Sequence, residues 1–154
     1  MDLGIKGKTA LVLGASQGIG AGIARALAGE GCNIIVGARR EDVLADLVGE
    51  IKSNHGVEAE AYSVDMTDKA GVAAMCDKIR GEWKPDRLLN NAGGPPGGNI
   101  IGIDDEIWEA SLQALLMSVI RISEAALDAM IEQKWGRILT VTSSGVIAPI
   151  PTIP

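Results

Sequence analysis

The feature of this sequence that most constrains its fold is a regular alternation between short apolar runs and longer segments of helical periodicity. The first run, at 8–14, is short and continuously apolar, which is typical of a strand covered on both faces. Further strands are predicted at 33–38, at 57–64, at the start of RLLNNAGG (87–94) and, as a buried strand, at 136–144. Strands that alternate with helices in this way predict an α/β fold with a doubly wound parallel sheet, in a single domain over residues 1–154.

The helical segments differ in the width of their apolar faces. One helix is predicted at 18–31, directly after the first strand, and others around 43–51 and 72–83, with Asp68 placed to cap the third. One face of the first helix consists of Ile19, Ile23, Ala24, Leu27 and Ala28. From about 105 to 133 the apolar residues spread around more than one face, which is typical of a helix packed on two sides. The sheet would cover one side, and a partner subunit is a candidate for the other.

Charge and cysteine content narrow the class of protein. The net charge of −6 argues against nucleic acid or an anionic membrane as the main partner. No apolar stretch is long enough to span a bilayer, and the N-terminus shows no signal-peptide pattern. Cys32 and Cys76 fit no metal-ligand spacing and are expected to be buried free thiols. We therefore expect a cytoplasmic protein without a metal site.

A glycine-rich turn, LGASQGIGAG (13–22), follows the first predicted strand with the spacing Gly14-x-x-x-Gly18-x-Gly20. Gly14 would let the strand turn sharply, Gly18 would let backbone N–H groups approach a pyrophosphate, and Gly20 would let the helix pack on the strand. Between a strand and a helix, this spacing favours dinucleotide binding over the alternative of a plain glycine-rich turn. The candidate cofactor contacts of the turn are Gly14, Ser16, Gln17, Gly18, Ile19 and Gly20.

The ends of the second and third strands indicate which dinucleotide is bound. The second strand ends in Ala38, Arg39 and Arg40, where an acidic residue would favour NAD and a basic residue NADP. Arg39 can form a bidentate pair with a phosphate, which favours NADP(H). Arg40 is a second candidate contact. The alternative for both arginines is a solvated loop position, and for Arg40 this alternative is preferred. After the third strand, Asp65 could accept from the adenine amino group with Met66 beside the ring, or Asp65 could cap a helix.

The glycine turn, Asp65, the stretch Asn90-Asn91-Ala92-Gly93 and GRILTVTSS (136–144) occur in an order and spacing that resemble the short-chain dehydrogenase/reductase family. The resemblance runs from about residue 5 to the last residue and is closest to NADP(H)-type members similar to 3-oxoacyl-ACP reductases. It implies a Rossmann-type fold, a nicotinamide cofactor, and oxidation or reduction of an alcohol/carbonyl pair. It also implies that Asn91, Ala92 and Gly93 lie beside the cofactor, and that residues 93–99 form a loop at the rim of the site.

The same resemblance implies four catalytic positions. Family members use a tyrosine as proton donor, a lysine four residues further on, a serine that polarises the carbonyl, and an asparagine that holds a water relay. The serine position falls on Ser143, with Ser144 as the second candidate and a local backbone role as the alternative for Ser143. The asparagine position falls on Leu115, and the Tyr-x-x-x-Lys pair would begin just beyond Pro154.

These departures leave three hypotheses about function. We expect the chain to be the cofactor-binding part of a longer NADP(H)-dependent reductase of a small carbonyl or alcohol, with its Rossmann domain incomplete at the C-terminus. The alternatives are a divergent, non-catalytic NADP(H)-binding protein and an interaction module. Assembly through the helix at 105–133 into a homodimer or homotetramer is implied by the resemblance. The sequence does not name the substrate, and a keto-acyl compound is a guess from family frequency alone.

Overall fold

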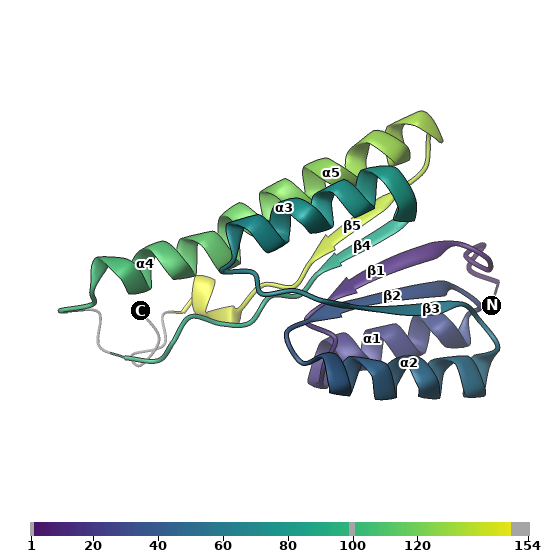
Figure 1. Cartoon of the computed structure of the whole chain (residues 1–154), viewed down its shortest axis with the longest axis horizontal. Coiled ribbons are helices and arrows are strands. Elements are labelled where there is room, and N and C mark those ends of the chain that lie inside the picture. Colours follow the sequence, from purple (N-terminus) through teal and green to yellow (C-terminus); the bar gives the residue numbers. More distant parts are fainter. Residues whose placement is uncertain (1, 99–100, 149–154) are drawn as a thin grey trace.

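The computed structural model describes residues 2–98 and 101–148 and contains a five-stranded sheet in the order β3-β2-β1-β4-β5 (Figure 1). The strands are β1 (Thr9–Leu13), β2 (Asn33–Ala38), β3 (Ala59–Ser63), β4 (Arg87–Asn90) and β5 (Arg137–Thr140). All neighbouring strands are parallel. The order reverses between β1 and β4, so the predicted doubly wound sheet is confirmed, with its switch point between these two strands.

Helices cover both faces of the sheet. Helices α1 (Gly18–Gly29) and α2 (Glu41–His55) lie on one face, and α3 (Lys69–Lys78) and α5 (Ser118–Glu132) lie on the other (Figure 1). Helix α4 (Asp105–Leu112) precedes α5 and projects beyond the sheet. A π-helical turn, Gln113–Met117, joins α4 to α5, where the sequence predicted one uninterrupted helix. Among the described residues, no helix has the length and apolar character needed to cross a bilayer.

The core between the sheet and α1 depends on small side chains. Ala24 and Ala28 are fully or almost fully buried and let α1 lie close to the strands. Ile19, on the predicted apolar face of this helix, is 63% exposed. It lies in the first turn of α1, beyond the ends of the strands, so helical periodicity alone could not reveal that the sheet does not extend beneath it.

The core on the opposite face agrees with the sequence pattern. Asp68 caps α3, since its carboxylate accepts a hydrogen bond of 3.0 Å from the Ala70 N–H. The predicted stripe is buried in full and consists of Val72, Met75, Cys76, Ile79 and Trp83. A second π-helical turn, Ile79–Trp83, extends α3 and carries the last two of these side chains into the core.

The expectation that the last strand is buried was wrong. β5 spans only Arg137–Thr140 and pairs with β4 at the edge of the sheet. Leu139 is 51% exposed there, and Ile138 is only partly covered. Among the described residues, no strand pairs with the outer edge of β5. The apolar run was read correctly as a strand, but burial depends on neighbours that its own sequence does not specify.

The long helical segment packs firmly on one side only. Ile122, Ala126 and Met130 are buried against the sheet and α3, as predicted for the sheet side. The exposed large apolar residues of the segment are Ile107, Trp108, Leu112, Leu116, Ile120, Leu127 and Ile131. The subunit contact predicted for that side therefore remains a prediction. The predicted rim loop (93–99) is described only to Gly98, and the proline-rich stretch that ends at Pro154 is described only to Ala148.

Candidate functional site

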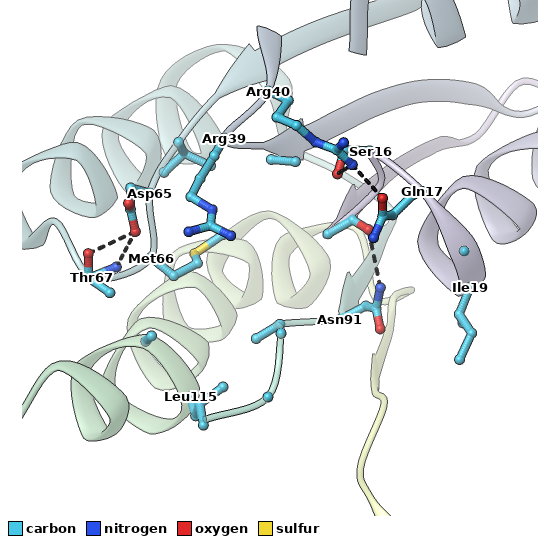
Figure 2. Close-up of a pocket in the computed structure, with 18 residues that line it drawn as sticks. Ser16, Gln17, Ile19, Arg39, Arg40, Asp65, Met66, Thr67, Asn91 and Leu115 are labelled. Atoms are coloured by element: carbon cyan, nitrogen blue, oxygen red, sulfur yellow. Dashed lines mark hydrogen bonds between the residues drawn. The ribbon is translucent and has the colours of Figure 1, made fainter. Parts of the chain in front are cut away.

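A cavity of about 860 Å³ lies at the carboxyl ends of β1 to β4, where the loops that follow these strands meet the π turn at 113–117 (Figure 2). Ligands of doubly wound sheets bind at this end of the strands. The cavity is lined by nearly all the predicted cofactor contacts: Gly14, Ser16, Gln17, Gly18, Ile19, Arg39, Arg40, Asp65, Met66, Asn91, Ala92 and Gly93. Gly20 and Ser143 are not among its lining residues.

The glycine turn is shaped by close backbone contacts. A Cβ added at Gly14, where φ is +62°, would collide with the carbonyl oxygen of Asn91. A Cβ at Gly20 would collide with the Gly14 carbonyl oxygen, so the absence of a side chain at Gly20 lets α1 lie against the turn after β1. Gly18 has φ +57° and no heavy atom near the position of a Cβ. Gly18 is the first residue of α1 and lines the cavity, so the N-terminus of this helix, where anions bind favourably, lies at the cavity.

Arg40 is fixed to the glycine turn. Its Nη2 donates to Ser16 Oγ at 3.1 Å and to Gln17 Oε1 at 2.7 Å (Figure 2). Arg40 nevertheless remains exposed, so the solvated position preferred for it is not contradicted, and its contact with the cofactor remains a prediction. The bonds join residues that are 24 and 23 positions apart, so only the three-dimensional structure reveals them. They hold the guanidinium where the end of β2 meets the start of α1.

Arg39 and Asp65 bring opposite charges to the adjoining wall. Asp65 Oδ1 accepts from the Thr67 N–H at 2.9 Å and from Thr67 Oγ1 at 2.8 Å. These two hydrogen bonds, and secondarily the charge of Arg39, lower the pKa of Asp65 and keep its carboxylate ionised. Asp65 thus caps a local turn, while Asp68 caps α3. Sequence analysis missed Thr67, although an Asp-x-Thr stretch before a helix is the signature of such a turn.

Two asparagines connect β4 with the rest of the site. Asn90 is buried, and its Nδ2 donates to Ser123 Oγ of α5 at 3.0 Å and to Thr140 Oγ1 of β5 at 3.5 Å. Asn91 Nδ2 donates to the Gly14 carbonyl at 3.4 Å. The pair therefore ties the central strand to its neighbours on one side and the glycine turn on the other.

The wall opposite the glycine turn is formed by the π turn. Ala114 and Leu115 line the cavity, and Leu115 is half-buried (Figure 2). The position predicted for a water-binding asparagine therefore does face the site, but with a side chain that cannot form a hydrogen bond. Sequence analysis did not single out Gln113, which is only 5% exposed and supports this wall from behind.

Ser143 lies outside the cavity. Its side chain is exposed, and its Oγ accepts a hydrogen bond of 3.0 Å from the Gly145 N–H, at the start of the short 3₁₀ turn Ser144–Val146. This is the local backbone role that was considered as the alternative for Ser143. Its catalytic role remains a prediction, as does that of Ser144.

Comparison with known proteins decides the family. The family model for short chain dehydrogenase matches residues 8–154. The chain belongs to the short-chain dehydrogenase family. Its sheet and helices are accordingly the Rossmann-type fold of that family, and the first four strands place their loops around one cavity.

Individual relatives within the short-chain dehydrogenase family include reductases. The 3-oxoacyl-[acyl-carrier-protein] reductase FabG of Escherichia coli (strain K12) is 35% identical over 142 residues, 92% of this chain and 57% of FabG. The uncharacterized oxidoreductase YvaG of Bacillus subtilis (strain 168) is 34% identical over 150 residues, 97% of this chain and 56% of YvaG. The L-sorbose reductase of Gluconobacter frateurii, solved with NADPH and L-sorbose, has a TM-score of 0.93 and 32% identity, and the match covers 100% of this chain and 59% of the reductase. The chain thus spans little more than half the length of these proteins.

Proposed function

We propose that this chain is the NADP(H)-binding part of an oxidoreductase that interconverts a carbonyl compound and an alcohol. The observation that carries the proposal is the presence of two arginines, Arg39 and Arg40, directly after β2. We call this part of the cavity the arginine corner. Arg40 is held on Ser16 and Gln17 of the glycine turn, and Arg39 lines the same cavity. Two guanidinium groups at this corner suit the 2′-phosphate that distinguishes NADP from NAD.

The surroundings of this corner support the same choice of cofactor. Ala38, the last residue of β2, is small and buried, so no carboxylate stands where the ribose hydroxyl of NAD would be bound. Asp65, the nearest acid of the cavity wall, already accepts two hydrogen bonds from Thr67. The related L-sorbose reductase, which is similar over this whole chain, was solved with NADPH.

In this proposal, other cavity residues bind different parts of the cofactor. The open N-terminus of α1, at Gly18, binds the pyrophosphate, and Asp65 with Met66 receives the adenine. Asn91 holds the glycine turn in place through the Gly14 carbonyl. When bound, the nicotinamide supplies or accepts the hydride of the reaction. The chain's own task is to bind and orient this group beside Leu115 and to keep the 2′-phosphate at the arginine corner.

A second candidate is a protein of the same fold that binds NADP(H) without catalysis. It is favoured by Leu115, which faces the cavity without a hydrogen-bonding group, and by Ser143, whose hydroxyl accepts from Gly145 outside the cavity. An interaction module that ignores nucleotides is the third candidate. For the catalytic proposal, Ser143 must turn from Gly145 toward a bound carbonyl.

We also propose a homodimer or homotetramer assembled through the segment at 105–133. Its support is the row of exposed apolar side chains that includes Leu112, Leu116 and Ile120, which the described residues do not cover. The mass of the protein in solution tests this assembly. A cytoplasmic location is proposed from Cys32 and Cys76, which are both buried free thiols, as expected in a reducing compartment.

Parallel titrations with NADPH and NADH test the proposed function. The protein as its gene encodes it is titrated with each nucleotide, and NADPH oxidation is then followed with keto-acyl, sugar and small ketone substrates. Tighter binding of NADPH with turnover supports the oxidoreductase. Binding without turnover on any carbonyl supports the non-catalytic candidate, and binding of neither nucleotide excludes both in favour of an interaction module.

A further inference from the structure

A buried amide links two walls of the cavity that come from distant parts of the sequence. One wall is the segment after β3, which includes Asp65 and Met66, and the other is the π turn with Ala114 and Leu115. Gln113 lies between them at 5% exposure. Its Nε2 donates to the Met66 carbonyl oxygen at 3.3 Å, across 47 positions of the sequence.

A cation fixes this amide from the other side. Arg121 Nη1 donates to Gln113 Oε1 at 3.0 Å from the first turn of α5, eight positions further along the chain. The two partners permit one orientation of the amide only, since a carbonyl needs the NH₂ group and a guanidinium needs the oxygen. Gln113 is therefore held at both ends and has little freedom to rotate.

The π turn itself is stabilised by a buried serine. The Ser118 N–H donates to the Gln113 carbonyl, which defines the wider turn, and Ser118 Oγ donates to the Ala114 carbonyl at 2.7 Å. Ser118 is 1% exposed. The backbone that presents Ala114 and Leu115 to the cavity is thus fixed locally, and Gln113 is the one side chain of this turn that reaches the facing wall by a hydrogen bond.

We propose that Gln113 is a positioning residue that sets the separation between the Met66 wall and the Leu115 wall. The inference rests on the proposed function, because the width of this gap matters only if the dinucleotide cofactor occupies it. A ligand held between two walls gains affinity when the walls are already at the right distance, since it does not have to order them itself. Gln113 contributes to binding without touching the ligand.

The substitution Gln113→Glu tests the contact with Met66 alone. The new carboxylate keeps Arg121 as its partner but has no proton to donate, and it places an oxygen against the Met66 carbonyl oxygen. We expect NADPH binding to weaken about tenfold, which is the effect of about one lost hydrogen bond. The melting temperature should stay within about 3 °C of the wild type, because the ion pair with Arg121 is retained. The matched control is Gln133→Glu, which adds the same charge at an exposed site at the end of α5.

Hydrogen exchange supplies a readout that does not depend on ligand. Amides of 64–68 and of 113–118 should exchange faster together in Gln113→Glu and remain unchanged in Gln133→Glu. If Gln113→Glu has a much lower melting temperature, Arg121→Met is the second variant. It removes the hydrogen bond to Gln113 Oε1 that orients the amide, and the expected loss of NADPH affinity is about threefold. NADPH affinity within twofold of the wild type in these variants, or faster exchange at 113–118 only, would overturn the positioning role. If the wild-type protein binds neither NADPH nor NADH, the proposed function is wrong and the positioning role falls with it.

Discussion

The inner strands β1 and β2 differ from the edge strand β5 in how completely the described residues cover them. Around β1 and β2, the strands are buried on both faces, and Ala10, Leu11 and Val12 have no exposed surface. At the edge of the sheet, no strand of the described residues pairs with the outer side of β5, and Leu139 is half exposed. The same kind of apolar run therefore stands for two different environments, a closed core near the N-terminus and an uncovered edge near the C-terminus.

The groups proposed to recognise the cofactor follow strands β1 to β3: the glycine turn, Arg39 and Arg40, and the segment after β3. The region around β5 carries the exposed apolar row of the long helix and the exposed Ser143. The proposed cofactor recognition therefore rests mainly on the better packed part of the chain, and the proposed catalysis and assembly involve the more exposed part.

The largest expected effect on stability comes from comparing the same substitution in the buried core and in the edge strand β5. Leu44→Ala, in α2 at 0% exposure, should lower the free energy of unfolding by about 3 kcal/mol through the cavity it creates. Leu139→Ala, at 51% exposure in β5, should cost less than about 1 kcal/mol. Urea unfolding of both variants measures the difference. Equal losses would mean that β5 is covered in solution, for example by a second subunit.

The next effect concerns the contact between the glycine turn after β1 and Asn91 after β4. Gly14→Ala places a methyl group against the Asn91 carbonyl and forces alanine to adopt φ +62°, so we expect a loss of about 2 kcal/mol and strongly weakened NADPH binding. Gly22→Ala is the control, because it lies within α1 with open space at the Cβ position and should stabilise the protein slightly. Thermal melts and NADPH titrations follow both. An unaffected Gly14→Ala would show that the turn and Asn91 separate easily.

Charge reversal at Arg39 tests whether the segment after β2 selects between NADPH and NADH. Arg39→Asp should weaken NADPH about tenfold or more, because a charged hydrogen bond to phosphate is replaced by repulsion, and should leave NADH binding equal or better. Arg80→Asp, an exposed site outside the cavity, controls for the change in net charge. The ratio of the two dissociation constants is the measurement. An unchanged ratio would remove Arg39 from the site.

The smallest effect concerns the ionisation of Asp65. Because the pKa of Asp65 is lowered in the folded protein, its charge contributes stability above the ordinary value near 3.9 and loses that contribution as the pH falls through the folded pKa. Asp65 is exposed, so the contribution should stay below about 1 kcal/mol. The stability advantage of the wild type over Asp65→Asn, measured by urea unfolding, should shrink between pH 6 and pH 2. A constant advantage would assign the stabilisation to hydrogen bonding alone.

Sequence patterns predicted the parts of the structure that depend on local chemistry. The β2 strand has the predicted bounds, Asp68 caps α3, and the glycine spacing identified a turn that only glycine can form. The exposure of Ile19 and the hydrogen bonds of Arg40 depend on more than local sequence. Whether Ile19 is buried depends on where the strands end beneath α1, and the partners of Arg40 lie more than 20 positions away.

The π turn escaped prediction for a related reason. Gln113–Met117 has the apolar pattern of an ordinary helix, and its wider hydrogen bonding depends on Ser118 and on the contact of Gln113 with Met66. The turn matters to the candidate site because it presents Leu115 to the cavity. Periodicity could place a helix here, and the resemblance could place Leu115 in the site, but neither could supply the long-range partners.

The cavity has one further consequence, which concerns regulation by abundance of ligand. Its lining comes from the loops after four strands and from the turn before α5. A molecule that fills the cavity therefore contacts and stabilises segments that lie far apart in the sequence. Such a molecule stabilises the fold in proportion to its concentration, by about 2.7 kcal/mol at one hundred times its dissociation constant. The resistance of this protein to proteases would then follow the nucleotide supply of its cell.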